Sequence, residues 1–304
     1  MTRPLNLGIV GLDTSHATIF TRLLMRTDDP HHVPGARIAA AFPGGSQTFS
    51  LSRNRVEGFT AELRDSYGIP IVNHIEDLGP DLDGFLLLSV DGRQHLQQFE
   101  VLAAFGKPVF VDKPFACSAR DAQAMAALAQ HRGIRLASSS AIPFSHGLRD
   151  LVPPNAEVHS AEAFGPMSLL EDYPSYYWYG VHSVHLLYAL MGAGCLDVRT
   201  CHTPTQDIIT GIWPDGRLGT VRGCRFDKAT FGATAFTTAG IYHGVVASEP
   251  FAYYTALLQA ILAFLRGDSF PVPLDQTVEA MAFLEAAEKS RCAGGATVSL
   301  ASLA

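Results

Sequence analysis

Short apolar runs alternate with segments of helical periodicity along the first half of the chain. The runs are apolar throughout rather than at every second position, which is typical of parallel strands buried on both faces. The predicted strands are residues 5–11, 37–42, 69–72, 83–90, 108–112 and 133–138, and the predicted helices are residues 14–25, 56–67, 94–104 and 118–130. This alternation favours an α/β fold with a doubly wound parallel sheet. Ligands of such sheets bind beyond the carboxyl ends of the strands, so the residues after each strand are the candidates for a site.

The pattern changes after residue 151. Apolar and polar positions then alternate, which predicts strands at residues 157–164, 198–203, 208–213, 218–224 and 233–242, together with helices at 180–191, 251–265 and 275–291. Many strands with few helices predict a second α/β domain on a mainly antiparallel, open sheet. We expect one domain over residues 1–150 and another over 151–304, with the helix at 275–291 packing back on the first.

Charge and cysteine content narrow the class of protein. The formal net charge is −7, from 22 basic and 29 acidic residues, which argues against nucleic acid or an anionic membrane as a partner. The five cysteines are odd in number and form no CxxC pair, as expected in a reducing compartment. No secretory leader is visible, and no apolar run reaches the roughly 18 residues of a membrane span. We expect a soluble, cytoplasmic protein.

A glycine turn stands where the first strand meets the first helix. The phosphate-binding turn G-x-G-x-x-G would begin at Gly11, but Asp13 and His16 replace its second and third glycines. A carboxylate at position 13 is unfavourable beside a phosphate, and the side chains of residues 13–15 can instead cap the helix. Both interpretations stay open. The candidates for dinucleotide binding are Gly8, Gly11, Asp13, Thr14, Ser15 and His16.

The end of the second predicted strand has no acidic residue for the ribose hydroxyls of NAD. Arg53 and Arg55 follow and would meet a 2′-phosphate, which favours NADP over NAD; the alternative is that both arginines are solvated.

Two further segments carry a family resemblance. Residues 106–114 read GKPVFVDKP and follow His95 at the end of an apolar strand and turn, and residues 180–185 read GVHSVH. With the closing helix at 278–290, they resemble the glucose–fructose oxidoreductase/inositol dehydrogenase family, called Gfo/Idh/MocA, over nearly the whole chain. Asp112 stands where that family more often has Glu, and His185 stands where it has Asp.

The resemblance implies a Rossmann domain that binds NAD or NADP, and a second domain for substrate and oligomerisation as a homodimer or homotetramer. It implies hydride transfer to or from a sugar, cyclitol or related carbonyl, with the catalytic lysine at Lys113 and its partner at His182. Further cofactor-binding positions are Val90, Asp91, His95 and Asp112.

The chemistry expected of Lys113 is proton transfer. Oxidising an alcohol needs a group that takes the hydroxyl proton, and in reduction the same group returns it. Lysine has an ordinary pKa of about 10.4, so burial or a nearby cation must lower it for work near neutrality.

A histidine-bearing helix is the expected substrate wall. Trp178, His182 and His185 are spaced i, i+4 and i+7 and would share one stripe. With Tyr179 they are the substrate-binding candidates, although each aromatic side chain can equally belong to the core. Spacing fixes no third ligand beside the two histidines, so no metal site is predicted.

Two other functions stay open. The degraded glycine turn also fits an isomerase, epimerase or lyase whose NAD is recycled or absent. A catalytically inactive binding or sensing protein is the third hypothesis.

Overall fold

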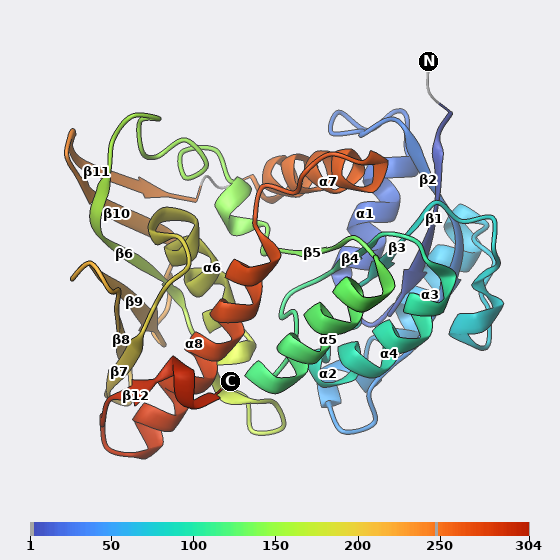
Figure 1. Ribbon diagram of the computed structural model, residues 1–304. Coiled ribbons are helices and arrows are strands. Elements are labelled where there is room, and N and C mark those ends of the chain that lie inside the picture. The colour runs from blue at the N-terminus through green and yellow to red at the C-terminus, as the bar shows by residue number, and fades with distance from the viewer. Residues whose placement is uncertain (1–2, 247–248, 304) are drawn as a thin grey trace. The chain divides into compact units, whose positions relative to one another are not determined.

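The computed structural model describes residues 3–246 and 249–303 and divides into two compact units (Figure 1). Unit 1 comprises Met1–Ala116, Asp121–Ser139 and Tyr254–Leu274, and unit 2 comprises Cys117–Arg120, Ser140–Tyr253 and Asp275–Ala304. The expected boundary at residue 150 therefore differs from the structure, in which the chain crosses between the units several times.

Unit 1 is built on a five-stranded, wholly parallel sheet. Its strands are β1 (Leu5–Val10), β2 (Ala36–Phe42), β3 (Gly84–Leu87), β4 (Val109–Val111) and β5 (Leu136–Ser138), in the order β2-β1-β3-β4-β5. Side chains of β1, β3 and β4 are buried almost without exception, which explains their unbroken apolar character. The predicted doubly wound parallel sheet is confirmed.

The strand predicted at residues 69–72 is reduced to one parallel bridge between Ala41 and Ile71. Pro70 offers no backbone N–H, and the chain turns into a 3-10 helix over Ile75–Leu78. The bridge lies on the outer edge of β2. With it, the strand order matches the 3-2-1-4-5-6 arrangement of dinucleotide-binding sheets.

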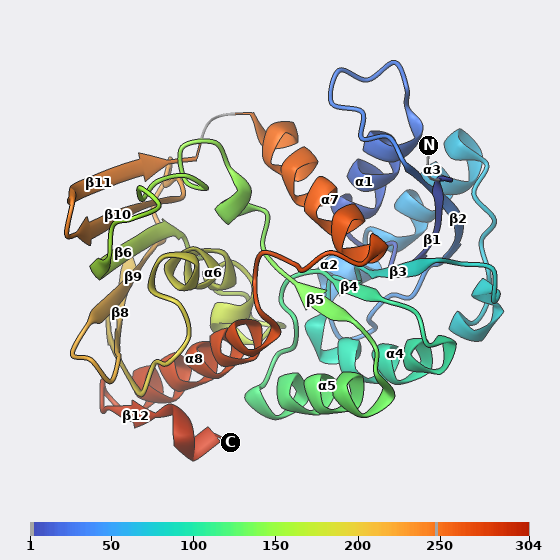
Figure 2. The same cartoon turned by 45° about the horizontal axis from the view of Figure 1, so that its top comes forward.

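Helices cover both faces of this sheet. They are α1 (Ser15–Met25), α2 (Ser50–Arg53), α3 (Val56–Tyr67), α4 (His95–Leu102), α5 (Ala119–Arg132) and α7 (Pro250–Arg266). Figure 2 shows α1 and α7 on one face and α4 and α5 on the other. Thr14 caps α1 by accepting a hydrogen bond from the backbone N–H of His16 (3.3 Å).

Unit 2 is built on a seven-stranded, mainly antiparallel sheet. Its strands are β6 (Val158–Pro166), β7 (Asp197–His202), β8 (Gln206–Ile212), β9 (Leu218–Cys224), β10 (Gly232–Thr237), β11 (Gly240–Val245) and β12 (Val298–Ser299), in the order β11-β10-β6-β9-β8-β7-β12. Only the β6–β9 pair is parallel in the described part of the chain. The single stretch predicted at 233–242 is the hairpin β10–β11, which turns at Gly240 with φ of 133°.

Two helices belong to unit 2. The helix α6 (Gly180–Met191) packs closely on the sheet because Gly165 and Gly219 leave room for Ser183 and Leu187. The helix α8 (Leu274–Cys292) is the one that we expected to pack on the first domain.

The structure groups residues 275–304 with unit 2 instead, and gives unit 1 the helix α7 from Tyr254 onward. The reason is visible in the polar contacts of α8. Tyr177 Oη donates to the carbonyl of Met281 (3.0 Å), and Tyr188 Oη donates to the Glu279 carboxylate (3.0 Å). On α7, Arg266 instead donates to the carbonyl of Gly35 in unit 1 (2.5 Å).

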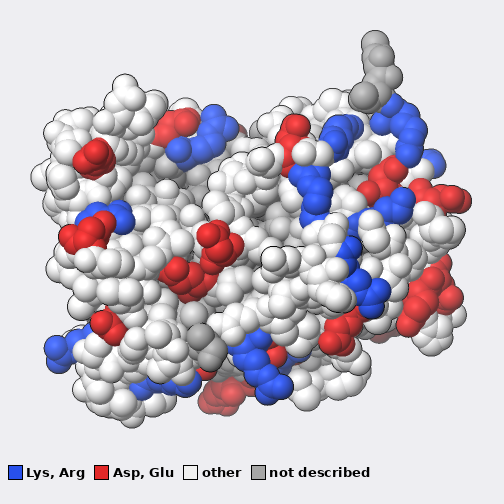
Figure 3. Space-filling view, in the orientation of Figure 1, with Lys and Arg blue, Asp and Glu red and all other residues white. Residues whose placement is uncertain are grey.

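Acidic and basic side chains are interspersed on the face of the molecule in Figure 3. Within the described residues, no helix has both the length and the apolar composition needed to cross a bilayer.

Candidate active site

The glycine turn packs the loop after β1 against the loop after β3. Gly11 has φ of 96°, and a Cβ atom built there would lie 2.2 Å from the backbone N of Ser89. Only glycine fits this position. Gly8, in contrast, lies inside β1 and packs against Phe85, so it has a structural place rather than one in the turn.

The Asp13 carboxylate is enclosed by the chain itself. It accepts hydrogen bonds from Ser52 Oγ (2.6 Å) and from the backbone N–H of Val90 (2.9 Å), and the residue has no exposed surface. Burial raises its pKa, against the opposing effect of these hydrogen bonds. Asp13 thus links three loops, and the first turn of α1 carries no acidic residue. A helix N-terminus of this kind favours an anion.

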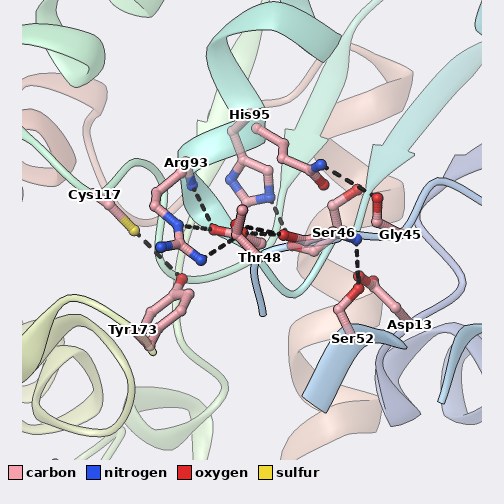
Figure 4. Close-up of polar contacts among 12 residues, drawn as sticks. Asp13, Gly45, Ser46, Thr48, Ser52, Arg93, His95, Cys117 and Tyr173 are labelled. Carbon is pink, nitrogen blue, oxygen red and sulfur yellow. Dashed lines mark hydrogen bonds and ion pairs between the residues drawn. The ribbon is translucent and has the colours of Figure 1, made fainter. Parts of the chain in front are cut away.

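A second buried carboxylate, that of Asp91, joins the same network, of which Figure 4 labels Asp13, Ser46, Ser52 and Arg93. Ser46 donates from Oγ to Asp91 (2.6 Å) and from its backbone N–H to Ser52 Oγ (2.7 Å). Asp91 also accepts from the guanidinium of Arg93 at 2.8 Å. Burial works to raise the pKa of Asp91, but the hydrogen bonds from Arg93 and Ser46 outweigh it and the pKa is lowered. Neither Ser46 nor Ser52 was among the predicted site residues.

His95 is fully buried between two carbonyl groups. Its Nε2 lies 2.8 Å from the oxygen of Ser89, and its Nδ1 lies 3.1 Å from that of Phe115. It was expected to bind the cofactor. In the structure its ring joins the loops that follow β3 and β4.

A pocket of about 250 Å³ opens beyond the carboxyl end of β2. It is lined by Phe42, Gly44, Gly45, Ile75, Gln94, Gln97, Gln98 and Val101. The Oε1 atoms of Gln94 and Gln98 are buried and have no hydrogen-bond partner within the described residues. Such acceptors suit a ligand with hydroxyl or amino donors.

The two arginines proposed for a 2′-phosphate are not among the residues that line this pocket. The guanidinium of Arg53 donates to the carbonyl of Gln47. Arg55 is exposed at the start of α3, and its charge acts on Lys113.

Lys113 lies directly beyond β4, at the carboxyl edge of the sheet. The backbone N–H of Asp112 donates to the carbonyl of Leu87 (2.8 Å) and extends the strand pairing to this point. Burial lowers the pKa of the Lys113 ammonium group, the Arg55 charge lowers it further, and the Asp112 charge opposes them. A lysine with a lowered pKa at this edge fits the expected proton transfer.

Asp112 belongs to a chain of three side chains. Its Oδ2 lies 2.6 Å from Nδ1 of His16, and Nε2 of His16 lies 3.1 Å from the hydroxyl of Tyr254. Burial works to raise the pKa of Asp112, but the charges of His16 and Lys113 prevail and lower it. Tyr254, on α7, was missed because helical periodicity alone does not show which neighbour a tyrosine meets.

In unit 2, Ser140 contacts both expected histidines of α6. Its Oγ lies 2.7 Å from Nδ1 of His182, and its backbone N–H donates to Nδ1 of His185 (2.7 Å). The run Ser138-Ser139-Ser140 after a predicted strand was the only signal for it.

The aromatic candidates lie just before this helix. Trp178 follows a 3-10 helix over Ser175–Tyr177, and α6 begins only at Gly180. Trp178 and Tyr179 thus precede α6, although both keep right-handed helical backbone angles. Tyr179 stacks on Phe231 with ring centres 6.3 Å apart. In the parts of the chain described, no three His, Cys, Asp or Glu residues are grouped to hold a metal ion.

The chain matches one protein-family model in sequence and shares its fold with solved structures. Residues 36–139 match the Gfo/Idh/MocA family model, described as "Oxidoreductase family, NAD-binding Rossmann fold". This match contains Lys113 and confirms the resemblance identified from the motifs. No curated protein matches the chain.

Three solved structures share the fold over almost their whole length. Myo-inositol 2-dehydrogenase from Lactobacillus plantarum is 15% identical, with a TM-score of 0.74 and coverage of 98% of this chain and 99% of that one. Scyllo-inositol dehydrogenase from Lactobacillus casei is 14% identical, with a TM-score of 0.75 and coverage of 99% and 100%. GenD2 from gentamicin A biosynthesis, solved with NAD, is 16% identical, with a TM-score of 0.73 and coverage of 98% and 97%. The family match supports an NAD-dependent oxidoreductase, and the solved structures show the fold of the chain.

Proposed function

We propose that the protein transfers a hydride between a nicotinamide dinucleotide and a sugar, cyclitol or sugar-derived carbonyl, with Lys113 as the proton-transfer group. The observation that carries the proposal is Lys113 itself, at the carboxyl edge of the parallel sheet with a lowered pKa. Inositol dehydrogenases among the proteins of the same fold support the substrate class.

The residues of unit 1 fit a dinucleotide. The N-terminus of α1 suits a pyrophosphate, since its first turn has no acidic side chain and the Asp13 carboxylate is enclosed. The pocket beyond β2 offers the Oε1 atoms of Gln94 and Gln98 to donors such as ribose hydroxyls. None of its lining residues is Lys or Arg, which favours NAD over the NADP suggested by Arg53 and Arg55.

The chain's own chemistry is acid–base. A bound nicotinamide would supply the hydride acceptor or donor. In oxidation, neutral Lys113 accepts the substrate hydroxyl proton on Nζ as the carbonyl forms. In reduction, protonated Lys113 donates that proton to the developing alkoxide.

The proposal assigns substrate binding to unit 2, with His182 as the second catalytic residue and His185, Trp178 and Tyr179 as contacts. The shared contact with Ser140 supports the histidines, because it fixes both rings at the start of α6. Removing either imidazole should then raise KM or lower kcat without weakening NAD binding.

Substitution of Lys113 tests the central role. We expect Lys113→Met to reduce kcat about 10²- to 10⁴-fold with an inositol or sugar substrate. Binding of NADH, followed by tryptophan fluorescence, should be unchanged. Lys107→Met is the matched control, since Lys107 lies before β4, at its opposite end. Equal turnover of the two variants would refute the role of Lys113.

A second candidate keeps the fold without net redox. The backbone N–H groups of Gly11 and Leu12 already donate to the carbonyls of Phe42 (3.0 Å) and Pro43 (2.8 Å), which leaves fewer donors for a pyrophosphate. Heat release of any co-purified dinucleotide separates the two. One equivalent of tightly held NAD with no net turnover would favour an isomerase, epimerase or lyase.

We also propose that the open face of the unit 2 sheet joins copies of the chain. Exposed apolar side chains are paired across neighbouring strands there, Ile212 with Leu218 and Phe236 with Ile241. Light scattering should show a dimer or tetramer, and Leu218→Glu should reduce it to a monomer.

A further inference from the structure

The chain formed by Asp112, His16 and Tyr254 lies beside the lysine to which we assign proton transfer. Asp112 and His16 are only 2% and 6% exposed. Asp112 lies in the turn after β4, and His16 lies in the first turn of α1. Tyr254 lies on α7, where it is the first residue that belongs to unit 1. The imidazole ring of His16 thus joins Asp112, which lies 96 positions along the chain from it, to Tyr254, which lies 238 positions from it.

The tautomer of His16 follows from the chemistry of the two groups that it contacts, Asp112 and Tyr254. The Asp112 carboxylate only accepts, so Nδ1 of His16 carries the hydrogen of the 2.6 Å contact. The hydroxyl of Tyr254 then contacts Nε2. The ring of His16 also stacks on Phe20, with ring centres 5.7 Å apart, and meets Tyr254 edge-on at 5.0 Å. The imidazole is therefore held on both nitrogens and on one face.

Only one oxygen of Asp112 is held in this way. Its Oδ1 is buried and has no hydrogen-bond partner among the residues described. The bond from His16 holds Oδ2 and stabilises the negative charge of this carboxylate, on which the charge and the backbone N–H of Lys113 also act.

The charge on Asp112 matters because it acts on Lys113. The charged groups that influence the ammonium group include Asp112 from the same turn and Arg55 from the start of α3. They act in opposite directions, so a more negative carboxylate favours the protonated lysine and a less negative one favours the neutral base.

We propose that His16 and Tyr254 are positioning residues for Lys113: they hold the Asp112 carboxylate through Oδ2 and limit the negative charge that it presents to the ammonium group. The inference rests on the proposed function for its catalytic meaning, but not for the electrostatic effect itself. His16, at the position where the phosphate-binding turn has its third glycine, would thereby act on the charge environment of Lys113.

The test measures the titration of Lys113 directly. The chain has four lysines, at 107, 113, 228 and 289, so acetylation of each can be followed by mass spectrometry as a function of pH. His16→Leu removes the donor to Asp112, and the Lys113 curve should move to higher pH by about one unit. Asp112→Asn removes the charge and should move it to lower pH. Opposite shifts at one lysine are not expected from a purely structural role.

Two milder variants complete the design. His16→Asn keeps an N–H donor near the place of Nδ1 and should stay close to the wild type. Tyr254→Phe loses only the hydroxyl and should give a smaller upward shift than His16→Leu. His131→Gln, at an exposed histidine of α5, is the control and should leave the curve unchanged.

The outcomes separate cleanly. An unchanged Lys113 curve in both His16→Leu and Tyr254→Phe overturns the proposal; if His16→Leu does not fold, Tyr254→Phe decides. The same variants are then compared in the pH profile of kcat/KM. If the labelling curve shifts and the rate profile does not follow, the positioning role stands and the catalytic role of Lys113 fails.

Discussion

The backbone N–H of Ser140 donates a hydrogen bond to Nδ1 of His185 across 2.7 Å. A backbone N–H is only a donor, so Nδ1 must be an acceptor and the hydrogen of the neutral ring lies on Nε2. Position 185 is where the family pattern has Asp. The histidine therefore keeps a hydrogen-bond acceptor at this place without a negative charge.

This relationship predicts how position 185 tolerates substitution. His185→Asn can present Oδ1 near the place of Nδ1 and should lower the free energy of unfolding by less than about 1 kcal/mol. His185→Leu leaves the buried N–H of Ser140 without its acceptor and should cost about 1–3 kcal/mol. Urea denaturation of both variants measures the difference. Equal stability would show that the hydrogen bond has little weight.

The lowered pKa of Lys113 predicts opposite pH profiles for the two directions of reaction. Oxidation needs neutral lysine, so kcat/KM should fall as the pH drops through the pKa of Lys113, which lies below the ordinary value of about 10.4. Reduction needs the protonated form, so its rate should fall as the pH rises through the same value. Rate profiles in both directions, measured with saturating cofactor, check this. If the oxidation rate and the reduction rate fell at different pH values, the proton transfer would have to be assigned to another group.

Asp13 is predicted to be structural, although it stands in the glycine turn. Asp13→Ala leaves Ser52 Oγ and the N–H of Val90 without their buried acceptor and should cost about 2–4 kcal/mol of stability. Asp13→Asn retains one acceptor and a similar shape, and removes a charge whose burial is unfavourable, so it should cost about 1 kcal/mol or less. Thermal and urea unfolding distinguish the two variants. A large loss of NADH affinity in a stable Asp13→Asn would instead make Asp13 a cofactor ligand.

Gly11 is predicted to accept no side chain. A Cβ atom at this position would lie 2.2–2.5 Å from backbone and side-chain atoms of Ser89, at a φ of 96° that L-residues rarely adopt. Gly11→Ala must therefore separate the loops after β1 and β3, and we expect loss of soluble protein or of NADH binding. Gly68→Ala is the control, since it has positive φ (65°) but no atom within 4 Å of an added Cβ.

The layers of the fold could be predicted because burial on both faces leaves a direct trace in the sequence. The strands around Leu86 and Phe110 are apolar at every position, and the structure buries them completely. The membership of α7 and α8 in the two units could not be predicted. Both helices have apolar positions, but periodicity does not show which surface covers them, and contacts such as Arg266 to Gly35 join distant residues.

Some residues of the candidate site could likewise be predicted from the sequence and others could not. Lys113 was identified through the family resemblance that the segment GKPVFVDKP at residues 106–114 carries. Ser140 and Tyr254 were missed because serine and tyrosine are common, and their partners lie 45 and 238 residues away. Asp13 was identified as a candidate, but the contacts of its carboxylate were not predicted. The sequence does not reveal that Ser52 donates a hydrogen bond to it.

The division of unit 1 into three chain segments has a consequence for synthesis on the ribosome. Its parallel sheet is complete once β5 has emerged, but the covering helix α7 begins only at Pro250, after most of unit 2 has been made. Contacts of such long sequence separation form slowly. Until α7 arrives, Leu265 does not cover Gly84 and His16 lacks its tyrosine. The nascent sheet therefore waits with one face partly open, which makes this stage the one at which a chaperone would bind the growing chain.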